Sequence, residues 1–562
     1  MRREWHLPRT NRTKTVALAR ALGIPPLVAQ ILLVRGVDTP DAAKRFLNPA
    51  MEHVSDPLLL TDMEAAIERI HRALERQERV LVYGDYDVDG VAGTALLTRA
   101  LRRFGIRECS YDVPNRFTEG FGLSVERVRQ AHADGVSLII TVDNGSAARD
   151  AAQTARELGI DLVVTDHHPT EGPLPKAAAV VNSAREVPGH VSANACGVAI
   201  AYKLGWALTG EMTDLDLVAL GTIADVVPLI GENRDLVAAG LEWAARRPRV
   251  GLEALAHVSG VSLTDLKAED VAYHLAPRLN AAGRLATAHT ALELLLTDSP
   301  SDALHIARQL DEANAQRRAL EAEILEEAER RVENELPPGA RSIVLGSRTW
   351  HPGLLGIVAA RLQSRYSLPT VLVVFGEDGF GRGSARSVEG LNIAKALATC
   401  QDCLIASGGH KAAAGVTLHE SALETFRQRF EETVSAVLPE SPPPAPLAID
   451  AVVSMSEIDG RLIRMLDRLA PFGHGNPPPV FLSQNVRVLP NSCREMRGGH
   501  IRFVVQEGPR LFAAVGFRMS GRLGEAAQAQ TMDLAFTPQL NSWRGEMSVQ
   551  LRVRDFRTAS AA

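Results

Sequence analysis

Three aspartates at alternate positions are the residues of this sequence best suited to chemistry. Asp85, Asp87 and Asp89 directly follow the apolar run Val80–Tyr83. Their mutual repulsion would cost stability unless a cation lay among them. An EF-hand calcium loop has the same spacing but needs a bidentate acid at its twelfth position, which is Leu96 here. The pattern predicts a divalent-metal site of another kind, with a solvated acidic turn that caps the next helix as the alternative.

Further candidate ligands follow other apolar runs of the same region. They are Asp143 after residues 138–142, the trio Asp166, His167 and His168 after residues 162–165, and Asp225 within the run 219–228. Asp143 alone could equally be a helix N-cap. Of two adjacent histidines we expect at most one to reach the same ion, and imidazole beside carboxylates suits Mn²⁺ or similar metals better than Ca²⁺. A buried aspartate such as Asp225 requires a metal or an arginine opposite it.

The combination is more informative than any single motif, because each acid is predicted to end a strand of one sheet. Between residues 80 and 235, β-rich apolar runs alternate with helical stretches, expected at 91–104 and 146–158. This alternation predicts a parallel sheet, and such sheets gather ligands at the carboxyl ends of their strands. Two metal ions that share a carboxylate can activate a water and hold the oxygens of a phosphoryl displacement. We therefore expect a metal-dependent phosphodiesterase in an α/β domain.

The rest of the chain divides into further regions. A charged helix expected at residues 301–335 is long enough to connect two domains. The proline-rich residues 439–446 are typical of a semi-rigid linker, and the short strands after them indicate a small barrel or sandwich. The expected regions are an N-terminal segment at 1–60, the catalytic domain at 61–240, a helical connector at 241–338, a second α/β domain at 339–438 and a barrel at 447–558.

Composition narrows the class of protein. The chain has 562 residues, of which 46% are hydrophobic and 23% charged, so we expect a globular protein with several domains. No apolar stretch approaches the roughly 18 residues of a membrane span, and the first residues lack the apolar core of a secretory signal, so we expect a cytoplasmic protein. Five cysteines argue against a disulfide framework, and we interpret Cys400 and Cys403 as ordinary thiols.

The charge is distributed unevenly along the chain. The net charge is −6, but residues 447–562 hold 14 Arg, no Lys and 10 acidic residues, which gives +4 there and −10 elsewhere. A basic C-terminal region mildly favours nucleic-acid binding by that region. An acidic remainder fits a site whose carboxylates bind metal cations.

Several separate motifs resemble those of the RecJ family, the single-strand-specific 5′ exonucleases of the DHH phosphoesterase superfamily. Besides the aspartate and DHH strings, they are PNRFTEG at 114–120, PRLNAAGRL at 277–285, WHPG at 350–353 and SGGH at 407–410. The resemblance covers nearly the whole chain. It implies an α/β protein in which a parallel-sheet DHH domain is joined by a long helix to a second α/β (DHHA1) domain, followed by a small OB-like β-barrel.

The resemblance also implies metal and catalytic roles. Asp87 and Asp143 would hold one Mn²⁺ or Mg²⁺ ion, and Asp89, Asp143, His167 and Asp225 would hold a second. His168 would face the scissile phosphate, with Asp85 and Asp166 as further catalytic candidates. Tyr83 stands where some relatives have a metal-binding histidine, so the first ion is expected to have fewer protein ligands.

A 5′ exonuclease also needs a pocket for a terminal phosphate, and the planar fork of arginine suits that dianion. The resemblance assigns phosphate or nucleic-acid binding to Arg116, Arg278, Asn280, Arg284, Ser384, Arg386 and His410. Which of Arg278 and Arg284 lies in the pocket stays open. Ordinary surface or interdomain ion pairs are the alternative for each arginine.

By resemblance the chain is expected to degrade single-stranded DNA from 5′ to 3′ and to release 5′-mononucleotides in recombination and repair. A monomer that works with a helicase and a single-strand-binding protein is implied in the same way. One alternative is a phosphodiesterase of the superfamily that acts on short oligonucleotides or cyclic dinucleotides, against which the connector and the barrel argue. Another is a catalytically inactive scaffold, against which the complete ligand set argues.

Overall fold

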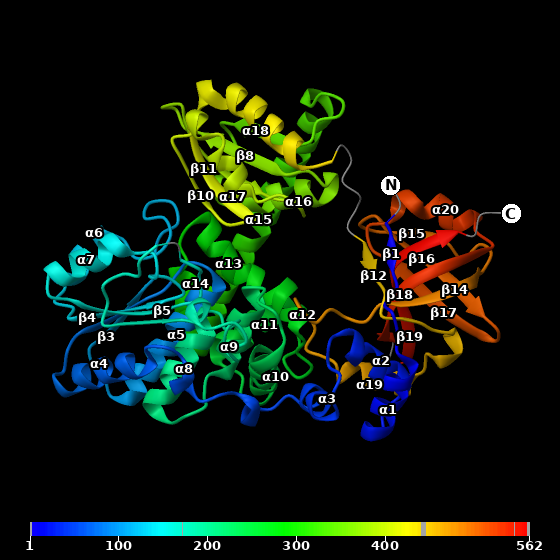
Figure 1. Cartoon of the computed structure of the whole chain (residues 1–562), viewed down its shortest axis with the longest axis horizontal. Coiled ribbons are helices and arrows are strands. Elements are labelled where there is room, and N and C mark those ends of the chain that lie inside the picture. Colours follow the sequence, from blue (N-terminus) through cyan, green and yellow to red (C-terminus); the bar gives the residue numbers. More distant parts are fainter. Residues whose placement is uncertain (1–2, 171, 440–445, 544–545, 559–562) are drawn as a thin grey trace.

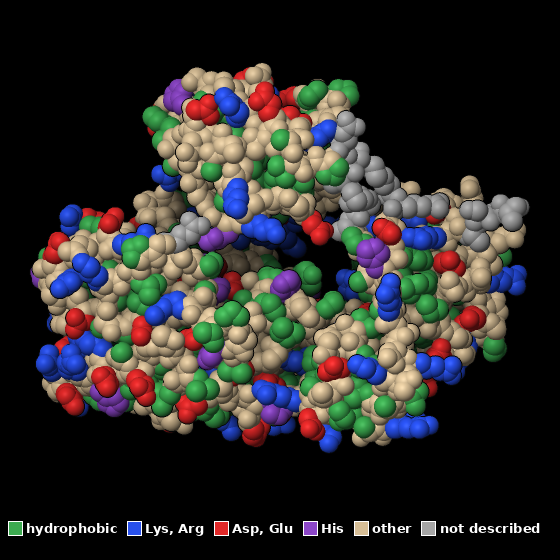
Figure 2. Space-filling view, viewed as in Figure 1, with side chains coloured by type: hydrophobic (Ala, Val, Ile, Leu, Met, Phe, Trp, Pro, Cys, Tyr) green, Lys and Arg blue, Asp and Glu red, His purple; other side chains and the backbone are tan. Residues whose placement is uncertain are grey.

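The protein consists of three lobes around a central opening, as seen in a computed structural model (Figures 1 and 2). The structure describes residues 3–170, 172–439, 446–543 and 546–558. The first lobe comprises residues 51–298, the second lobe residues 343–438, and the barrel lobe residues 447–558 together with residues 3–47. The 36-residue helix α15 (Pro300–Glu335) joins the first two lobes, as the sequence predicted. The predicted fold class is confirmed.

The first lobe is built on a five-stranded parallel sheet in the order β3-β2-β4-β5-β6. Its strands are β2 (Val80–Tyr83), β3 (Cys109–Asp112), β4 (Leu138–Val142), β5 (Asp161–Asp166) and β6 (Ala179–Asn182). Helices α4 (Met63–Glu75), α5 (Val88–Phe104) and α8 (Gly197–Thr209) cover one face, and α6 (Val125–Ala133) and α7 (Arg149–Glu157) cover the other. Strands buried on both faces have continuous apolar runs, which is why the sequence revealed them.

A helical layer completes the first lobe beside α5. It consists of α9 (Leu215–Ala224), α10 (Gly231–Arg246), α11 (Val250–Ser259), α12 (Ala268–Asp270), a π-helical turn at Val271–Leu275, α13 (Ala276–Leu285) and α14 (His289–Leu296). The first turns of α15 pack into the same core through Ala303, Ala307 and Leu310. The last turns of α15 enter the core of the second lobe through Ile324, Ala328 and Val332. The helix is therefore anchored in both lobes.

The second lobe holds a mixed five-stranded sheet in the order β10-β11-β9-β8-β7. Its strands are β7 (Ile343–Ser347), β8 (Thr370–Phe375), β9 (Phe380–Arg386), β10 (Ala406–Gly409) and β11 (Ala413–His419). Helices α15 and α16 (Leu355–Tyr366) pack on one face, and α17 (Ile393–Ala398) and α18 (Leu423–Val437) on the other. The predicted linker follows, but its residues 440–445 lie outside the described part of the chain.

The barrel lobe is a seven-stranded sheet in the order β13-β14-β18-β19-β17-β16-β15, closed by a further pairing of β14 with β16. Its strands are β13 (Ala451–Val452), β14 (Phe481–Val488), β15 (Arg494–Met496), β16 (His500–Glu507), β17 (Arg510–Gly516), β18 (Thr531–Trp543) and β19 (Glu546–Thr558). Helices α19 (Gly460–Asp467) and α20 (Leu523–Gln528) accompany it. Closure leaves few free strand edges.

The N-terminal residues belong structurally to the barrel lobe (Figure 1). Strand β1 (Trp5–His6) pairs with β12 (Leu447–Ala448). Helices α1 (Arg12–Leu22), α2 (Pro26–Val34) and α3 (Pro40–Leu47) share one core with the barrel strands. No single helix of the described residues is long and apolar enough to cross a membrane; α1 and α2 pass that test only as a pair bent by 116°.

A buried arginine joins the first lobe to the barrel lobe. Arg234 of α10 is 2% exposed and donates to the carbonyl oxygens of residues 468–471 and of Phe46 at 2.7–3.3 Å. The Phe46 ring stacks on its guanidinium at 4.1 Å. Beside this joint, the Leu229 amide donates to the His474 carbonyl at 2.8 Å. The barrel loop at residues 473–476 thereby contacts the segment that follows Asp225.

Two sequence expectations about this lobe need correction. The run 219–228 is not a strand, because Leu215–Ala224 form α9, and Asp225 lies at its C-terminus. Nine of the ten helix residues are buried, so the run is apolar on all sides and shows no helical periodicity. The helix expected from residue 91 begins at Val88, and the one expected at 146–158 spans Arg149–Glu157.

Candidate metal centre and active site

The acidic candidates meet at the carboxyl edge of the parallel sheet, and the turn after β2 brings the first three there. Asp87 is the N-cap of α5 and accepts hydrogen bonds from the backbone N–H groups of Asp89 (3.0 Å) and Gly90 (3.3 Å). The turn is so tight that a Cβ at Gly90 would lie 2.5 Å from the Asp85 nitrogen. Asp87 thus caps the helix through Oδ1, which leaves Oδ2 for another partner.

The amino end of α8 closes over two further aspartates. Asp89 is 1% exposed and accepts hydrogen bonds from the backbone N–H groups of Gly197 (2.6 Å) and Val198 (2.9 Å). Asp143 follows β4 with a φ of 64° and is 2% exposed. A Cβ at Gly197 would lie 2.5 Å from the Asp143 Cβ, so glycine is needed for α8 to approach this closely. Both carboxylates are held rigidly inside the lobe.

His167 brings an imidazole into the same cluster. Its Nε2 lies 3.0 Å from Oδ1 of Asp143, 3.7 Å from Oδ2 of Asp225 and 3.8 Å from Oδ2 of Asp89. In each of three overlapping groups of residues, the potential ligand atoms lie within 4.8 Å of one another. The groups are Asp85–Asp87–Asp143, Asp89–His167–Asp225 and Asp143–His167–His168. Asp143 belongs to two of the three groups, which places it centrally.

The cluster contains buried polar atoms that no other group satisfies. Asp85 Oδ1, Asp143 Oδ1, Asp225 Oδ2 and His167 Nε2 have no hydrogen-bond partner within the described residues. Buried polar atoms without partners are costly and rare in folded proteins. Their convergence is the arrangement that cations would satisfy, and carboxylate oxygens with one imidazole suit Mn²⁺ or Mg²⁺. The residues present therefore fit a site for two divalent ions.

The pKa values in the cluster reflect burial and crowding. Burial and the neighbouring Asp87 carboxylate raise the pKa of Asp89 to about 7. Burial and the carboxylate of Asp89 raise the pKa of Asp225 to about 9. Burial lowers the pKa of His167 to about 4, so this imidazole is neutral at pH 7, as a metal ligand must be. Bound cations would reverse the carboxylate shifts, because opposite charge favours the ionised form.

Asp166 holds the second histidine instead of joining the cluster. It accepts hydrogen bonds from the Ser146 N–H (3.0 Å) and from the two histidine backbone N–H groups, and it lies 2.9 Å from the Nδ1 of His168. Burial alone would lower the pKa of His168, but the bond to Asp166 raises it to about 9. His168 is therefore an imidazolium at neutral pH, with Nε2 as the atom available to a substrate.

Three arginines converge between the first and second lobes. Arg116, Arg284 and Arg386 line one cavity with Ser384, which accepts a hydrogen bond from Arg386 at 2.9 Å. The Arg116 guanidinium also stacks on the Tyr86 ring at 4.1 Å. Burial and the charge of Arg116 lower the pKa of Arg284 to about 10 and also lower that of Arg386. Arg382 and Asp378 also line this cavity. Within the described residues no ion pair joins Arg116, Arg284 or Arg386 to a carboxylate, so their positive charges favour an anion in the cavity.

The structure separates the other predicted phosphate ligands from this cavity. Arg278 pairs with Asp311 at 2.8 Å and donates to the His274 carbonyl, which is the ordinary ion pair that was the alternative reading. Asn280 lines a neighbouring cavity together with Arg284 and Arg317. His410 follows β10 and lines a separate hollow together with His168.

Sequence reasoning missed one side chain at this hollow. Phe121 is 54% exposed, and its ring lies 5.3 Å from that of His168 and 6.4 Å from that of Tyr86. A large exposed aromatic side chain at this position can stack on a planar ring of a bound ligand. Its position directly after the PNRFTEG motif was the available signal.

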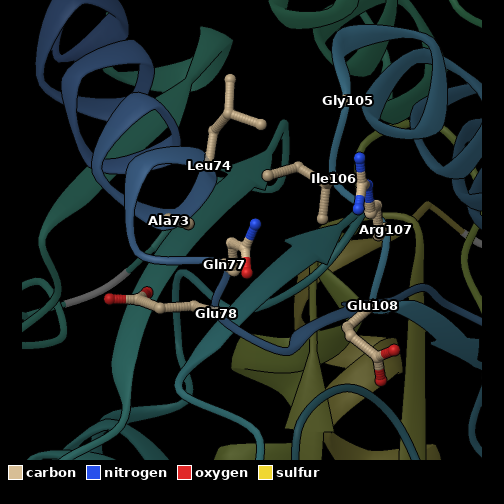
Figure 3. A pocket seen from close by; sticks show the side chains of 8 residues that line it. All are labelled: Ala73, Leu74, Gln77, Glu78, Gly105, Ile106, Arg107 and Glu108. Carbon is tan, nitrogen blue, oxygen red and sulfur yellow. The ribbon is translucent and has the colours of Figure 1, made fainter.

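A second hollow lies at the opposite, amino edge of the same sheet (Figure 3). It is lined by Ala73, Leu74, Gln77, Glu78, Gly105, Ile106, Arg107 and Glu108. Glu78 already pairs with Arg69 at 2.6 Å, and Glu108 lies 3.5 Å from Arg79. Both glutamates of this hollow thus already have arginine partners.

Comparisons with known proteins place this geometry in a family. Family models match in three places: the DHH family N-terminal domain at residues 79–222, the DHHA1 domain at 340–436 and the RecJ OB domain at 449–555. The single-stranded-DNA-specific exonuclease RecJ of Bacillus subtilis is 35% identical over 98% of this chain and 70% of its own length. The Escherichia coli protein of the same name is 33% identical over 98% of this chain and 99% of its own length. This chain belongs to the RecJ family.

Solved RecJ structures match the whole chain. RecJ from Thermus thermophilus in complex with Mn²⁺ superposes with a TM-score of 0.85 at 30% identity, covering 99% of this chain and 80% of that one. The Mg²⁺ complex of the same protein superposes with a TM-score of 0.79 at 29% identity, covering 99% and 79%. In RecJ terms the first lobe holds the DHH domain, the second lobe is the DHHA1 domain, and the barrel is the OB domain.

Proposed function

We propose that this chain is a single-stranded-DNA-specific exonuclease that uses two divalent ions, Mn²⁺ or Mg²⁺, and degrades its substrate from 5′ to 3′ into 5′-mononucleotides. One observation carries the proposal: unsatisfied buried ligand atoms converge near a cavity whose lining includes Arg116, Arg284 and Arg386, which form no ion pair with a carboxylate among the described residues. A cluster of that kind suits phosphodiester hydrolysis, and the cavity suits a terminal phosphate. The names of the RecJ relatives support the choice of single-stranded DNA.

The metal ligands are assigned from the geometry and the family resemblance. We assign Asp87 and Asp143, with Asp85 at their side, to one ion, and Asp89, Asp143, His167 and Asp225 to the other. Two ions in such a site supply an activated water and charge stabilisation of the phosphoryl transition state. Tyr83 packs on the α6–α7 face with its hydroxyl 3.4 Å from Glu119, so we expect the first ion to have the smaller protein ligand set.

His168 is assigned to the scissile phosphate. Because Asp166 holds its Nδ1, the protonated ring presents Nε2–H to a phosphate oxygen. Negative charge grows on the oxygens of the transition state, so a fixed cationic donor stabilises that state. Asp166 is a positioning residue in this scheme. His410 and the neighbouring backbone N–H groups would contact the same phosphate from the second lobe.

The arginine cavity explains release of one nucleotide at a time. Arg116, Arg284, Ser384 and Arg386 are held by both lobes, so their distance from the metal cluster is fixed. A 5′-phosphate bound there places the next phosphodiester at the metals. Because Arg278 pairs with Asp311, we do not assign it to this pocket. Asn280 lines the adjoining cavity and is assigned to the following nucleotide.

We propose that the barrel binds the single strand beyond the cleavage site, because its Arg552 and Arg554 face the first lobe. A cytoplasmic monomer that acts in recombination and repair with a helicase and a single-strand-binding protein is what the RecJ relationship suggests. The competing phosphodiesterase of short oligonucleotides or cyclic dinucleotides would have no use for this barrel.

The deciding experiment uses single-stranded DNA labelled at either end, with and without a 5′-phosphate, and Mn²⁺. Progressive release of mononucleotides from the 5′ end, with a preference for the phosphate, is expected. A substrate-length series tests the alternative, since preference for dinucleotides over 20-mers would contradict our choice. Tight binding of DNA with no metal-dependent cleavage would instead indicate an inactive scaffold.

A further inference from the structure

The barrel lobe and the first lobe touch through an ion pair at the margin of the central opening. Glu269 of α12 lies 3.6 Å from the Nη1 of Arg552 on β19. Both side chains remain accessible, at 49% and 32% exposure. Helix α12 lies on the side of the first lobe that faces the barrel (Figure 1), and the opening beside it is visible in Figure 2. The pair therefore spans a boundary that solvent reaches.

Side chains suited to a single strand surround this pair on the barrel. The Arg552 guanidinium lies 5.3 Å from the centre of the Phe517 ring, which is 47% exposed. Arg554, two residues further along the same strand, is held by a hydrogen bond of its Nε to Thr537 at 3.0 Å. Burial, followed by the charge of Arg552, lowers the pKa of Arg554. Two guanidinium groups thus lie together with one nearby carboxylate.

The first lobe contributes an aromatic side chain from an unusual piece of backbone. Helix α12 runs directly into the π-helical turn Val271–Leu275, and π-helical turns are frequently found at functional sites. Tyr273 within that turn is 72% exposed and lies near Arg554 of the barrel. The structure thus exposes one large aromatic on each side of the boundary. Exposed aromatics beside arginines are the composition of a single-strand-binding surface.

We propose that Glu269 and Arg552 form a clasp that single-stranded DNA opens, with a backbone phosphate taking the place of the Glu269 carboxylate on Arg552 and bases stacking on Phe517 and Tyr273. The inference rests on the proposed function, because it concerns the path of the same substrate. A phosphodiester and a carboxylate are both monoanions that match the guanidinium fork. Exposed ion pairs contribute little free energy, so the exchange costs little.

The clasp makes Glu269 an intramolecular competitor of the substrate. Removal of an acid at a simple docking contact would weaken the contact between the lobes and would not help binding. Removal of a competitor frees Arg552 and strengthens DNA binding. The sign of the effect distinguishes the clasp from a structural brace.

The test compares Glu269→Gln, Arg552→Gln and the double variant in the full chain with Mn²⁺. The measured quantity is KM for 5′-phosphorylated (dT)20 relative to (dT)4, which has only three nucleotides beyond its first scissile bond. We expect Glu269→Gln to lower that ratio about threefold and Arg552→Gln to raise it about tenfold. In Arg552→Gln the slope of log KM for (dT)20 against log salt concentration should also fall by about one, because one phosphate contact is lost. The double variant should match Arg552→Gln, because no cation remains for the acid to mask. Glu242→Gln on α10, where Glu242 is 57% exposed and pairs with Arg246, is the matched control.

Stacking is tested with Tyr273→Leu and Phe517→Leu. Each should raise KM for (dT)20 and leave KM unchanged for a 20-mer that is abasic beyond its first four nucleotides, since stacking requires bases. If the ratio of KM for (dT)20 to KM for (dT)4 is equal or higher in Glu269→Gln than in the wild type, the clasp is overturned. The proposed function still stands in that case, provided that the wild type cleaves both oligonucleotides. Failure of the wild type to cut either oligonucleotide would overturn both.

Discussion

Nε2 of His167 lies 3.0 Å from Oδ1 of Asp143, and neither atom has a hydrogen-bond partner within the described residues. Two buried atoms that both carry lone pairs and face each other at this distance need a cation or a proton between them. The imidazole is neutral at pH 7, because burial lowers the pKa of His167 to about 4. A neutral imidazole and a carboxylate that face each other in this way can serve together as ligands of one metal ion.

Asp143→Asn tests this shared ligand role. The change keeps the size of the side chain but removes the charge at the centre of the cluster. We expect Mn²⁺ affinity, measured by calorimetry, and exonuclease activity both to fall by at least about 100-fold. Glu126→Gln at an exposed position of α6 is the control. Retention of wild-type Mn²⁺ affinity in Asp143→Asn would exclude this residue as a ligand.

His168→Gln should separate chemistry from metal binding. The variant loses the cationic donor that Asp166 orients, so kcat is expected to fall roughly 100-fold. Mn²⁺ affinity should stay within about threefold of the wild type, because the assigned ligands are intact. Quenched single-turnover assays give the rate of the chemical step, and calorimetry on the same protein gives the Mn²⁺ affinity. A parallel loss of both would mean that His168 is itself a ligand.

Arg386→Gln tests the terminal-phosphate pocket. Loss of one charge-assisted contact of about 1.5–3 kcal/mol should reduce kcat/KM for 5′-phosphorylated DNA about 10- to 100-fold. The same variant should cut 5′-hydroxyl DNA at nearly the wild-type rate, since that substrate has no phosphate for the pocket. Arg278→Gln, whose arginine pairs with Asp311 outside the cavity, is the matched control. Equal losses on both substrates would argue against a phosphate pocket.

Arg234→Met tests the joint between the first lobe and the barrel lobe. The substitution leaves the carbonyl oxygens of residues 468–471 without their donor. We expect the free energy of unfolding to fall by roughly 3 kcal/mol, because buried carbonyl groups lose their partners. Thermal denaturation and the rate of proteolysis between the lobes are the readouts. Arg246→Met, on the same helix but 76% exposed, should change neither.

The sequence was sufficient for the parallel sheet and for most of its acidic edge. Buried parallel strands are continuous apolar runs, and the acids stand directly after them, so the neighbourhood of Asp87, Asp143 and His167 followed from sheet geometry. Asp225 was expected in the right cluster for the wrong reason. Its segment is an apolar helix buried on all sides, and a short apolar run of that kind has no period that distinguishes it from a strand.

Other features depend on contacts between distant residues and could not be predicted. Arg278 and Arg284 lie on the same helix, and only the position of Asp311 on α15 shows which of them is engaged in an ion pair. The joint around Arg234 likewise needs carbonyl groups more than 230 residues away in the sequence. The packing of residues 3–47 against the barrel has no local signal, because each helix is amphipathic or apolar and would suit many partners.

The packing of residues 3–47 against the barrel constrains the order in which the chain can fold during its synthesis. Helices α1–α3 leave the ribosome early, yet the barrel strands that bury their apolar faces begin about 400 residues later, between Leu47 and Leu447. At ~5–20 residues per second, the wait lasts roughly 20–80 s. During that time the nascent chain exposes Val28, Ile31 and Leu32, which are fully buried in the finished protein. Helices α1–α3 are thus among the last elements to pack, and they are where a nascent-chain chaperone would be needed most.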